Sequence, residues 1–320
     1  MSLFAPPPDV ATEVFASVPD DLRRRGQRCE WGESNKRGEP VDCFLEGPSF
    51  DREGNLWLVD IAYGRILKVS PSGDFTVVAE YDGWPNGLKI HRDGRIFVTD
   101  YRRGIVRVDP VSGEVTTVVG HRNTEGFKGV NDLFFASNGD LYFTDQGQTG
   151  MHDPTGRVYR VPADALDDRP VRLEQLVGTV PSPNGLVMNP AETILYVAVT
   201  RMNNVWRVPI MPDGSPSKVG VFVQLSGGLG GPDGMAVDRD GNLAVCHAGM
   251  GSVWLFSRLG EPLARIRSCT GLTTTNCAYG GADGRDLYIT ESETGTVLRA
   301  RLDVPGEPMF ARREDPADRW

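Results

Sequence analysis

Short apolar runs separated by turn residues recur along the whole chain, and they predict strands rather than helices. Six runs are rich in aromatic and β-branched residues, at 56–59, 96–99, 141–144, 195–198, 243–246 and 287–290. A glycine stands shortly before five of them, and only the fourth run, which follows Glu192, lacks one. Glycine accepts the positive φ of a tight hairpin turn. Each run is therefore predicted to be the second strand of a β-hairpin.

The segment before each hairpin turn repeats as well. Six first strands begin with an acidic or amide residue, called here the marker residues: Glu46, Asn86, Asn131, Asn184, Asp233 and Asn276. A third strand follows in each repeat, at 65–69, 104–108, 156–161, 205–208, 252–256 and 296–300. Four-stranded units recurring at a period of about 40–50 residues are typical of propeller blades. We predict an all-β protein, a six-bladed β-propeller with four antiparallel strands per blade.

The last repeat supplies three clear strands and then continues into Pro305 and a charged tail. An open blade edge invites aggregation, so another segment has to complete the ring. Residues 12–18 have the strand pattern for this, and we predict that this N-terminal strand closes the last blade. Residues 23–39 are predicted to form an irregular loop over one channel mouth, and residues 303–320 a loosely held tail. All 320 residues are predicted to form one domain.

The composition of the chain limits the kinds of molecule that it is expected to bind. The net charge is −9, from 34 basic and 43 acidic residues, without the basic stripe that nucleic-acid binding needs. The N-terminus lacks the features of a signal peptide, and no apolar run is long enough for a membrane span. The five cysteines match no metal-binding spacing and are expected to be reduced thiols. We expect a cytoplasmic protein that binds a small molecule, and neither nucleic acid nor a membrane.

The marker residues are the strongest candidates for chemistry. First strands of propeller blades line the central channel, so the six side chains are expected to gather at one mouth. All six carry a carboxylate or amide oxygen, which suits a hard cation such as Ca²⁺ or Mg²⁺. In the alternative interpretation, Asn and Asp before glycine are ordinary turn formers. Glu46 favours the metal interpretation, because Glu is a poor turn former.

A second ring is expected one strand farther out, because the hairpin returns the chain to the markers' height about 14 residues later. The residues at that spacing are Asp60, Asp100, Asp145, Ala198, His247 and Thr290. The acidic members and His247 are candidates to orient the marker amides or to move protons. The alternative is that aspartates at strand ends cap the next turn.

At these residues the sequence resembles the gluconolactonase / senescence-marker-protein (regucalcin-like) family of six-bladed propellers, which is related to diisopropyl fluorophosphatase. The resemblance runs from about residue 44 to residue 301. Its motifs are Leu45-Glu46-Gly47-Pro48, Val130-Asn131-Asp132, Ser182-Pro183-Asn184-Gly185-Leu186 and Pro232-Asp233-Gly234-Met235.

The resemblance implies one Ca²⁺ held by Glu46, Asn184 and Asp233, with Asn131 as a fourth ligand or a substrate contact. Mg²⁺, Mn²⁺ or Zn²⁺ stay open as alternatives. Some members grip sugar-acid substrates with an Arg just before the Asn-Asp pair, and here residues 128–130 are Lys, Gly and Val. Other residues are then candidates for contacting the substrate: Trp84, Asn86, Tyr63 and Asp145.

The predicted reaction is hydrolysis of a lactone, with the metal polarising the ring carbonyl. Asp233 is a candidate to orient or deprotonate the water or to attack the carbonyl, and Asp132 or His247 to transfer the proton. The sequence lacks the Gly-x-Ser-x-Gly motif that would indicate a serine nucleophile. Two alternatives remain, which are a phosphotriesterase-like hydrolase using the same metal and a non-catalytic calcium-binding propeller.

Overall fold

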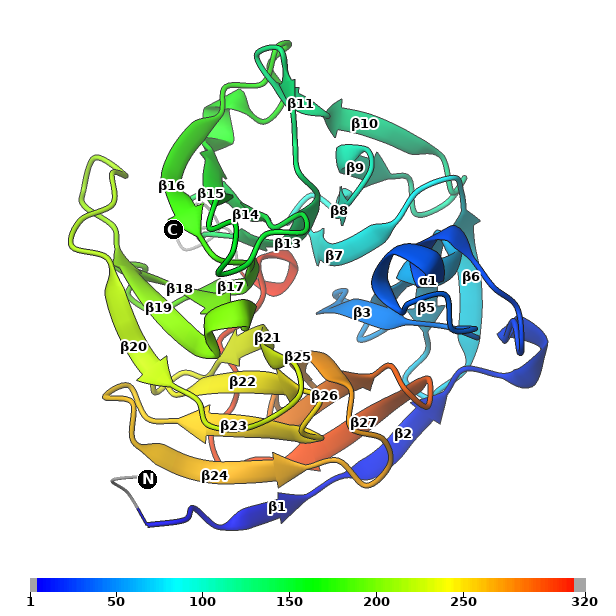
Figure 1. Cartoon of the computed structure of the whole chain (residues 1–320). Helices are drawn as coiled ribbons and strands as arrows, with labels where there is room; N and C mark the ends of the chain where they lie inside the picture. Colours follow the sequence, from blue (N-terminus) through cyan, green and yellow to red (C-terminus); the bar gives the residue numbers. More distant parts are fainter. Residues whose placement is uncertain (1–4, 314–320) are drawn as a thin grey trace.

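The computed structural model describes residues 5–313, which form a ring of six twisted sheets around a central channel (Figure 1). The innermost strand of each sheet lies nearest the channel, and the next strands follow outward in chain order. The first three blades consist of β3 (Leu45–Phe50), β4 (Leu56–Asp60), β5 (Arg65–Val69) and β6 (Phe75–Glu80); β7 (Pro85–Ile90), β8 (Ile96–Asp100), β9 (Gly104–Val108) and β10 (Val115–Val119); and β13 (Val130–Phe135), β14 (Leu141–Asp145), β15 (Gly156–Val161) and β16 (Glu174–Val180).

The other three blades follow the same order. They consist of β17 (Pro183–Met188), β18 (Ile194–Val199), β19 (Asn204–Pro209) and β20 (Gly220–Gln224); β21 (Gly231–Val237), β22 (Leu243–Ala248), β23 (Ser252–Phe256) and β24 (Pro262–Arg267); and β25 (Thr274–Gly280), β26 (Asp286–Glu291), β27 (Thr296–Arg301) and β2 (Glu13–Ser17). The predicted six-bladed propeller is confirmed. Shorter elements are β1 (Asp9–Ala11), β11 (His121–Arg122), β12 (Glu125–Gly126), the helix α1 (Glu30–Asn35), and the 3₁₀ turns η1 (Asp20–Leu22), η2 (Ile61–Tyr63), η3 (Ala163–Ala165), η4 (Thr200–Met202) and η5 (Phe310–Arg312).

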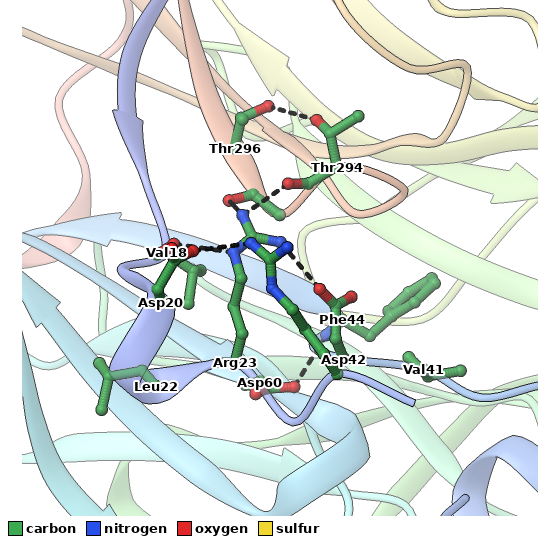
Figure 2. A network of polar contacts seen from close by, with 12 residues as sticks. Val18, Asp20, Leu22, Arg23, Val41, Asp42, Phe44, Asp60, Thr294 and Thr296 are labelled. Atoms are coloured by element: carbon green, nitrogen blue, oxygen red, sulfur yellow. Dashed lines mark hydrogen bonds and ion pairs between the residues drawn. The ribbon is translucent and has the colours of Figure 1, made fainter. Parts of the chain in front are cut away.

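The N-terminal strand closes the ring, as predicted. β2 pairs antiparallel with β27 and is the outer strand of the last blade. The structure adds a second connection, because β1 pairs in parallel with β24 of the fifth blade. Arg23 then fastens the chain that follows: its guanidinium donates to the carbonyls of Val18 and Thr294 and pairs with Asp42 at 3.0 Å (Figure 2). The N-terminal segment therefore joins the last two blades and leads into the first.

The hydrophobic core lies between neighbouring sheets. One cluster, for example, packs Val59 and Ile66 of the first blade against Leu88 and Val98 of the second, with all four side chains fully buried. Each blade thus buries both faces against its neighbours, and only the innermost strands line the channel. This packing holds the marker residues on a rigid frame.

All six innermost strands carry a β-bulge at or next to the marker residue, where the register gains one residue relative to the second strand. Bulges re-aim side chains and are common beside active sites. The markers lie inside strands, so the turn-former interpretation is wrong for them. The glycine after a marker has another cause, since a Cβ on Gly87 would meet the Asp132 side chain at 2.5 Å and one on Gly234 the Asn276 side chain at 2.0 Å.

Residues 23–39 are not wholly irregular, because they contain α1. Glu30 and Glu33 stand in its first turn, where acidic side chains complement the helix dipole. Trp31 is buried against Phe44, with ring centroids 4.6 Å apart, and this contact anchors the helix beside β3. Gln148, from the loop after β14, reaches Asn35 at 3.3 Å. The segment therefore lies over the ring on the side where the innermost strands begin (Figure 1).

The described part of the predicted tail is firmly packed, which corrects the expectation of a loose tail for residues 303–313. Phe310 is buried and stacks on Phe135 with ring centroids 5.3 Å apart. Arg313 pairs with Glu192 at 2.7 Å, and Gly306 forms a β-bridge to Asp238. This segment (red in Figure 1) lies at the end of the channel opposite the markers. Residues 314–320 fall outside the described residues.

Replacing Phe310 by Ala is expected to lower the free energy of unfolding by about 3–5 kcal/mol, because it empties a stacked, buried site. The measurement is urea denaturation of both proteins. Val111→Ala is the matched control, since Val111 is 94% exposed. A Phe310 effect no larger than that of the control would contradict the packed tail.

Candidate functional site

The six marker side chains converge at one channel mouth. Five of them are buried and Asp233 is partly exposed. Asp132 joins the ring from the third blade, where the others have glycine or, in the last blade, Cys277. The site therefore holds three carboxylates, of Glu46, Asp132 and Asp233.

Asn276 links two of these carboxylates. Its Nδ2 donates to Glu46 Oε2 at 2.9 Å and lies 3.3 Å from Asp132 Oδ2, while its Oδ1 accepts from the Cys277 N–H. Glu46 Oε2 also accepts from the Gly47 N–H at 2.8 Å, and Asp132 Oδ1 from the Leu133 N–H at 2.8 Å. The bulge backbone and one amide thus fix the orientation of both acids.

Burial and mutual repulsion both disfavour the charged forms of these carboxylates. Burial raises the pKa of Glu46 well above its usual range, and the charges of Asp233 and Asp132 add to the shift. Burial, followed by the charge of Asp132, raises the pKa of Asp233 to about 8, although a hydrogen bond with Asn184 opposes this. Such an arrangement favours a cation at the mouth.

The donor set is made of oxygens and mixes acids with amides. Within residues 5–313, no three His, Cys, Asp or Glu side chains form a metal-binding group by themselves, so a cation here needs amide oxygens as well. Asn86 Oδ1 is buried without a hydrogen-bond partner. Asn131 donates its Nδ2 to Gln146 Oε1 at 2.8 Å, which leaves its oxygen outside this contact. These features fit a hard divalent cation.

A lysine lies inside the channel beneath the acids. Lys89 Nζ lies 3.9 Å from Asp132 Oδ1 and donates to the carbonyl of Leu88 at 3.1 Å. Its side chain is only 16% exposed. One ammonium and one divalent cation would together balance the three carboxylates, which reduces the cost of burying them.

His247 lies behind the channel wall. It is fully buried, its Nδ1 accepts from the Trp254 indole N–H at 3.2 Å, and burial lowers its pKa. A Cβ on Gly228 would stand 2.4 Å from its Nε2, so the loop before β21 covers that nitrogen. The imidazole is therefore neutral and enclosed, and the structure does not bring it to the mouth with Asp233 and Asp132.

The predicted second ring is found at the expected height, where Asp60, Asp100 and Asp145 face the residues just before the markers in register. Their side chains hold loops instead of marker amides. Asp60 pairs with Arg65, Asp100 accepts from the Tyr81 hydroxyl at 2.8 Å, and Asp145 accepts from the Gly129 N–H at 2.9 Å. All three aspartates are completely buried.

The two aromatic candidates also have structural partners. The Tyr63 hydroxyl donates to the Val41 carbonyl, which ties η2 to the segment above it. Trp84 lies beside Tyr101, and the guanidinium of Arg102 lies 5.2 Å from its ring centroid. Of the predicted substrate contacts, Asn86 and Asn131 are the ones placed in the marker ring.

The sequence pattern did not predict two cations at the mouth, Arg201 and Lys36, because both lie on connecting segments outside the repeated strands. The positive charges of Arg201 on η4 and Lys36 at the end of α1 both act on Asp233. Burial lowers the pKa of Lys36, whose ammonium lies 4.6 Å from the Phe44 ring centroid. Gln146 was missed as well; it joins Asn131 to the Ser182 hydroxyl at 3.0 Å.

Residues 44–293 match the family described as the SMP-30/Gluconolactonase/LRE-like region. The chain belongs to this family. A gluconolactonase from Zymomonas mobilis is 30% identical over 82% of this chain and 80% of its own length. A lactonase drp35 from Staphylococcus aureus is 31% identical over 74% of this chain and 72% of its own length.

Solved structures show the same fold in the family. A calcium-binding protein, regucalcin, from Agrobacterium tumefaciens superposes with a TM-score of 0.76 at 22% identity, covering 97% of this chain and all of that one. A gluconolactonase from Xanthomonas campestris gives a TM-score of 0.71 at 23% identity, over 93% and 98% of the two chains. No helix of residues 5–313 is both long and apolar enough to cross a membrane.

Proposed function

We propose that this protein hydrolyses a lactone at the marker end of its channel with the help of one divalent cation. The observation that carries the proposal is the convergence of Glu46, Asp132 and Asp233 among amide oxygens, with the pKa values of Glu46 and Asp233 raised. Membership in a family that includes a gluconolactonase and a lactonase at about 30% identity supports the reaction class.

The residues that would hold the cation are Glu46, Asn184 and Asp233, with Asn131 as a further ligand. Calcium is the preferred ion, because carboxylate and amide oxygens suit a hard cation and the family's motifs supply no thiolate or imidazole here. When bound, such an ion polarises a carbonyl and stabilises the negative charge that develops on its oxygen.

The chain's own residues supply orientation and proton transfer. Water adds to the ring carbonyl carbon, the ring C–O bond breaks, and the leaving alkoxide takes the proton that the water gives up, so the product is a hydroxy acid. Asp132 and Asp233 are the carboxylates at the mouth that can hold this proton between the two events. Asn276 and Lys89 fix Asp132 from two sides.

The test combines metal analysis with activity. Purified protein is expected to contain about one divalent ion, to lose lactone hydrolysis on chelation, and to recover most activity with Ca²⁺ among Ca²⁺, Mg²⁺, Mn²⁺ and Zn²⁺. A panel of lactones and phosphotriesters is measured in parallel. Turnover of phosphotriesters alone, or of neither class by the metal-loaded protein, would overturn the proposal.

His247→Gln is expected to leave the pH dependence of kcat/KM unchanged, because the imidazole is enclosed and neutral. Stability is expected to fall by about 1–3 kcal/mol through disturbed contacts with Trp254. Lactone kinetics across pH and thermal unfolding measure the two effects, with exposed His121→Gln as the control. Loss of one limb of the pH profile would instead show that His247 transfers the proton.

A further inference from the structure

Two cations, Arg201 and Lys36, lie near Asp233 without a close ion pair to any acid in the described part of the chain. Arg201 follows the fourth blade's second strand, and Lys36 lies over the first blade, so they approach from opposite sides of the ring. Among residues 5–313, neither side chain forms a hydrogen bond or ion pair. Their charges nevertheless act on Asp233 and on each other, and the charge of Glu293 acts on Lys36 as well.

Both cations stand on fixed elements. The Thr200 hydroxyl donates to the carbonyl of Pro232 at 2.8 Å. Arg201 follows Thr200 and Asp233 follows Pro232, so this bond ties the segment that carries Arg201 to the strand that carries Asp233. The Lys36 N–H donates to the Gly32 carbonyl at 2.8 Å, and its ammonium lies over the Phe44 ring. Phe44 comes two residues before Glu46. The positions of both charges are thus tied to the marker strands.

An open groove of about 530 Å³ lies beside Arg201. Tyr101, Gln146 and Ser182 contribute to its wall. Gln146 also bonds to Asn131, which ties the wall of the groove to the ring of marker residues. Ser182 holds a φ of 66°, which costs a non-glycine residue energy and is common at binding sites. Its hydroxyl accepts from Gln146 at 3.0 Å.

The positive charges of Arg201 and Lys36 at this mouth suggest an anionic ligand. An overall charge of −9 and three carboxylates repel anions, and burying the Lys36 ammonium costs hydration energy. Building on the lactone hydrolysis proposed above, we propose that the substrate carries a carboxylate separate from its ester ring. Arg201, which lines the groove, and Lys36, which follows the groove residue Asn35, would bind this carboxylate. Arginine and lysine together recognise such a group by charge-assisted hydrogen bonds.

Binding without turnover tests the carboxylate site directly. Tetrahydrofuran-2-carboxylate, which has the ring and the charge but no ester, is titrated calorimetrically into metal-loaded protein. Arg201→Met and Lys36→Met are each expected to weaken its binding about tenfold or more, and Arg201→Lys by less. Arg258→Met, at an exposed arginine on the β23–β24 turn, is the matched control. Equal affinity in Arg201→Met, Lys36→Met and the unchanged protein would overturn the inference.

Kinetics separate this inference from the proposed function. The pair of substrates is γ-valerolactone and 5-oxotetrahydrofuran-2-carboxylate, in which a carboxylate replaces the methyl group. The anionic lactone is expected to have the lower KM, and Arg201→Met is expected to raise that KM about tenfold and to raise the KM of the neutral lactone much less. Hydrolysis of both lactones with equal KM in both proteins would overturn the carboxylate site while the lactonase proposal stands. Charge-dependent binding without hydrolysis of any lactone would do the reverse.

Discussion

Asp233→Asn is expected to lower kcat/KM for lactone hydrolysis by about a thousandfold, because it removes a carboxylate that would both hold the cation and face the water. The fold is expected to accept the change. Four other blades already place Asn at this position of the bulged strand, at Asn86, Asn131, Asn184 and Asn276. Steady-state kinetics and calcium titration measure the loss of turnover and of affinity.

The same variant is expected to be more stable than the unchanged protein when both are free of metal at pH 8, since one of three repelling charges is gone. Added Ca²⁺ is then expected to raise the melting temperature of the unchanged protein and to do so much less in Asp233→Asn. Asp240→Asn, at an exposed turn, is the control and should leave both quantities unchanged. Full turnover in Asp233→Asn would show that this carboxylate is not part of the reaction site.

Metal-free protein is expected to lose stability as pH rises from about 4 to about 8. The pKa of Asp233 is about 8 in the folded chain and that of Glu46 is raised, so between these limits the folded state binds more protons than the unfolded state. Stability rises with pH only where the unfolded state binds more protons, so here it falls. The expected loss is about 2 kcal/mol, because water and side-chain movement relieve part of the repulsion.

Two histidines, buried His247 and half-buried His91, work in the opposite direction. Burial lowers the pKa values of His91 and His247, and this contribution to stability grows as pH rises through their unfolded value. The decisive quantity is therefore the difference in free energy of unfolding between the unchanged protein and Asp233→Asn, measured without metal from pH 4 to pH 8. Saturating Ca²⁺ should flatten the profile of the unchanged protein. A difference independent of pH would mean that the carboxylates do not interact.

The propeller could be predicted because each blade repeats one local pattern. The markers, the hairpin turns and the apolar second strands recur at similar spacing, and a strand's place in its blade fixes its place in the ring. The same repeat places Glu46, Asn131, Asn184 and Asp233 at one mouth. It could not foresee the bulge at each marker, because a register shift is set by how neighbouring strands and blades pack.

The second ring shows what the spacing along a strand cannot predict. Asp60, Asp100 and Asp145 stand at the expected level, yet they hold loop backbone and Arg65 instead of marker amides. Spacing along a strand gives the level of a residue. Which partner its side chain takes depends on the loops packed outside it, and those loops differ from blade to blade.

By itself the sequence determined the blade count, the strand that closes the ring and the oxygen-rich ring of marker residues, since all three follow from a repeated local pattern. Only the tertiary structure decided that Asn276 joins Glu46 to Asp132, that Lys89 lies below them, and that His247 is enclosed. It also decided that residues 303–313 pack at the far end of the channel and that Lys36 and Arg201 reach the mouth. These contacts join residues far apart in the chain or on non-repeating loops, so no local periodicity encodes them.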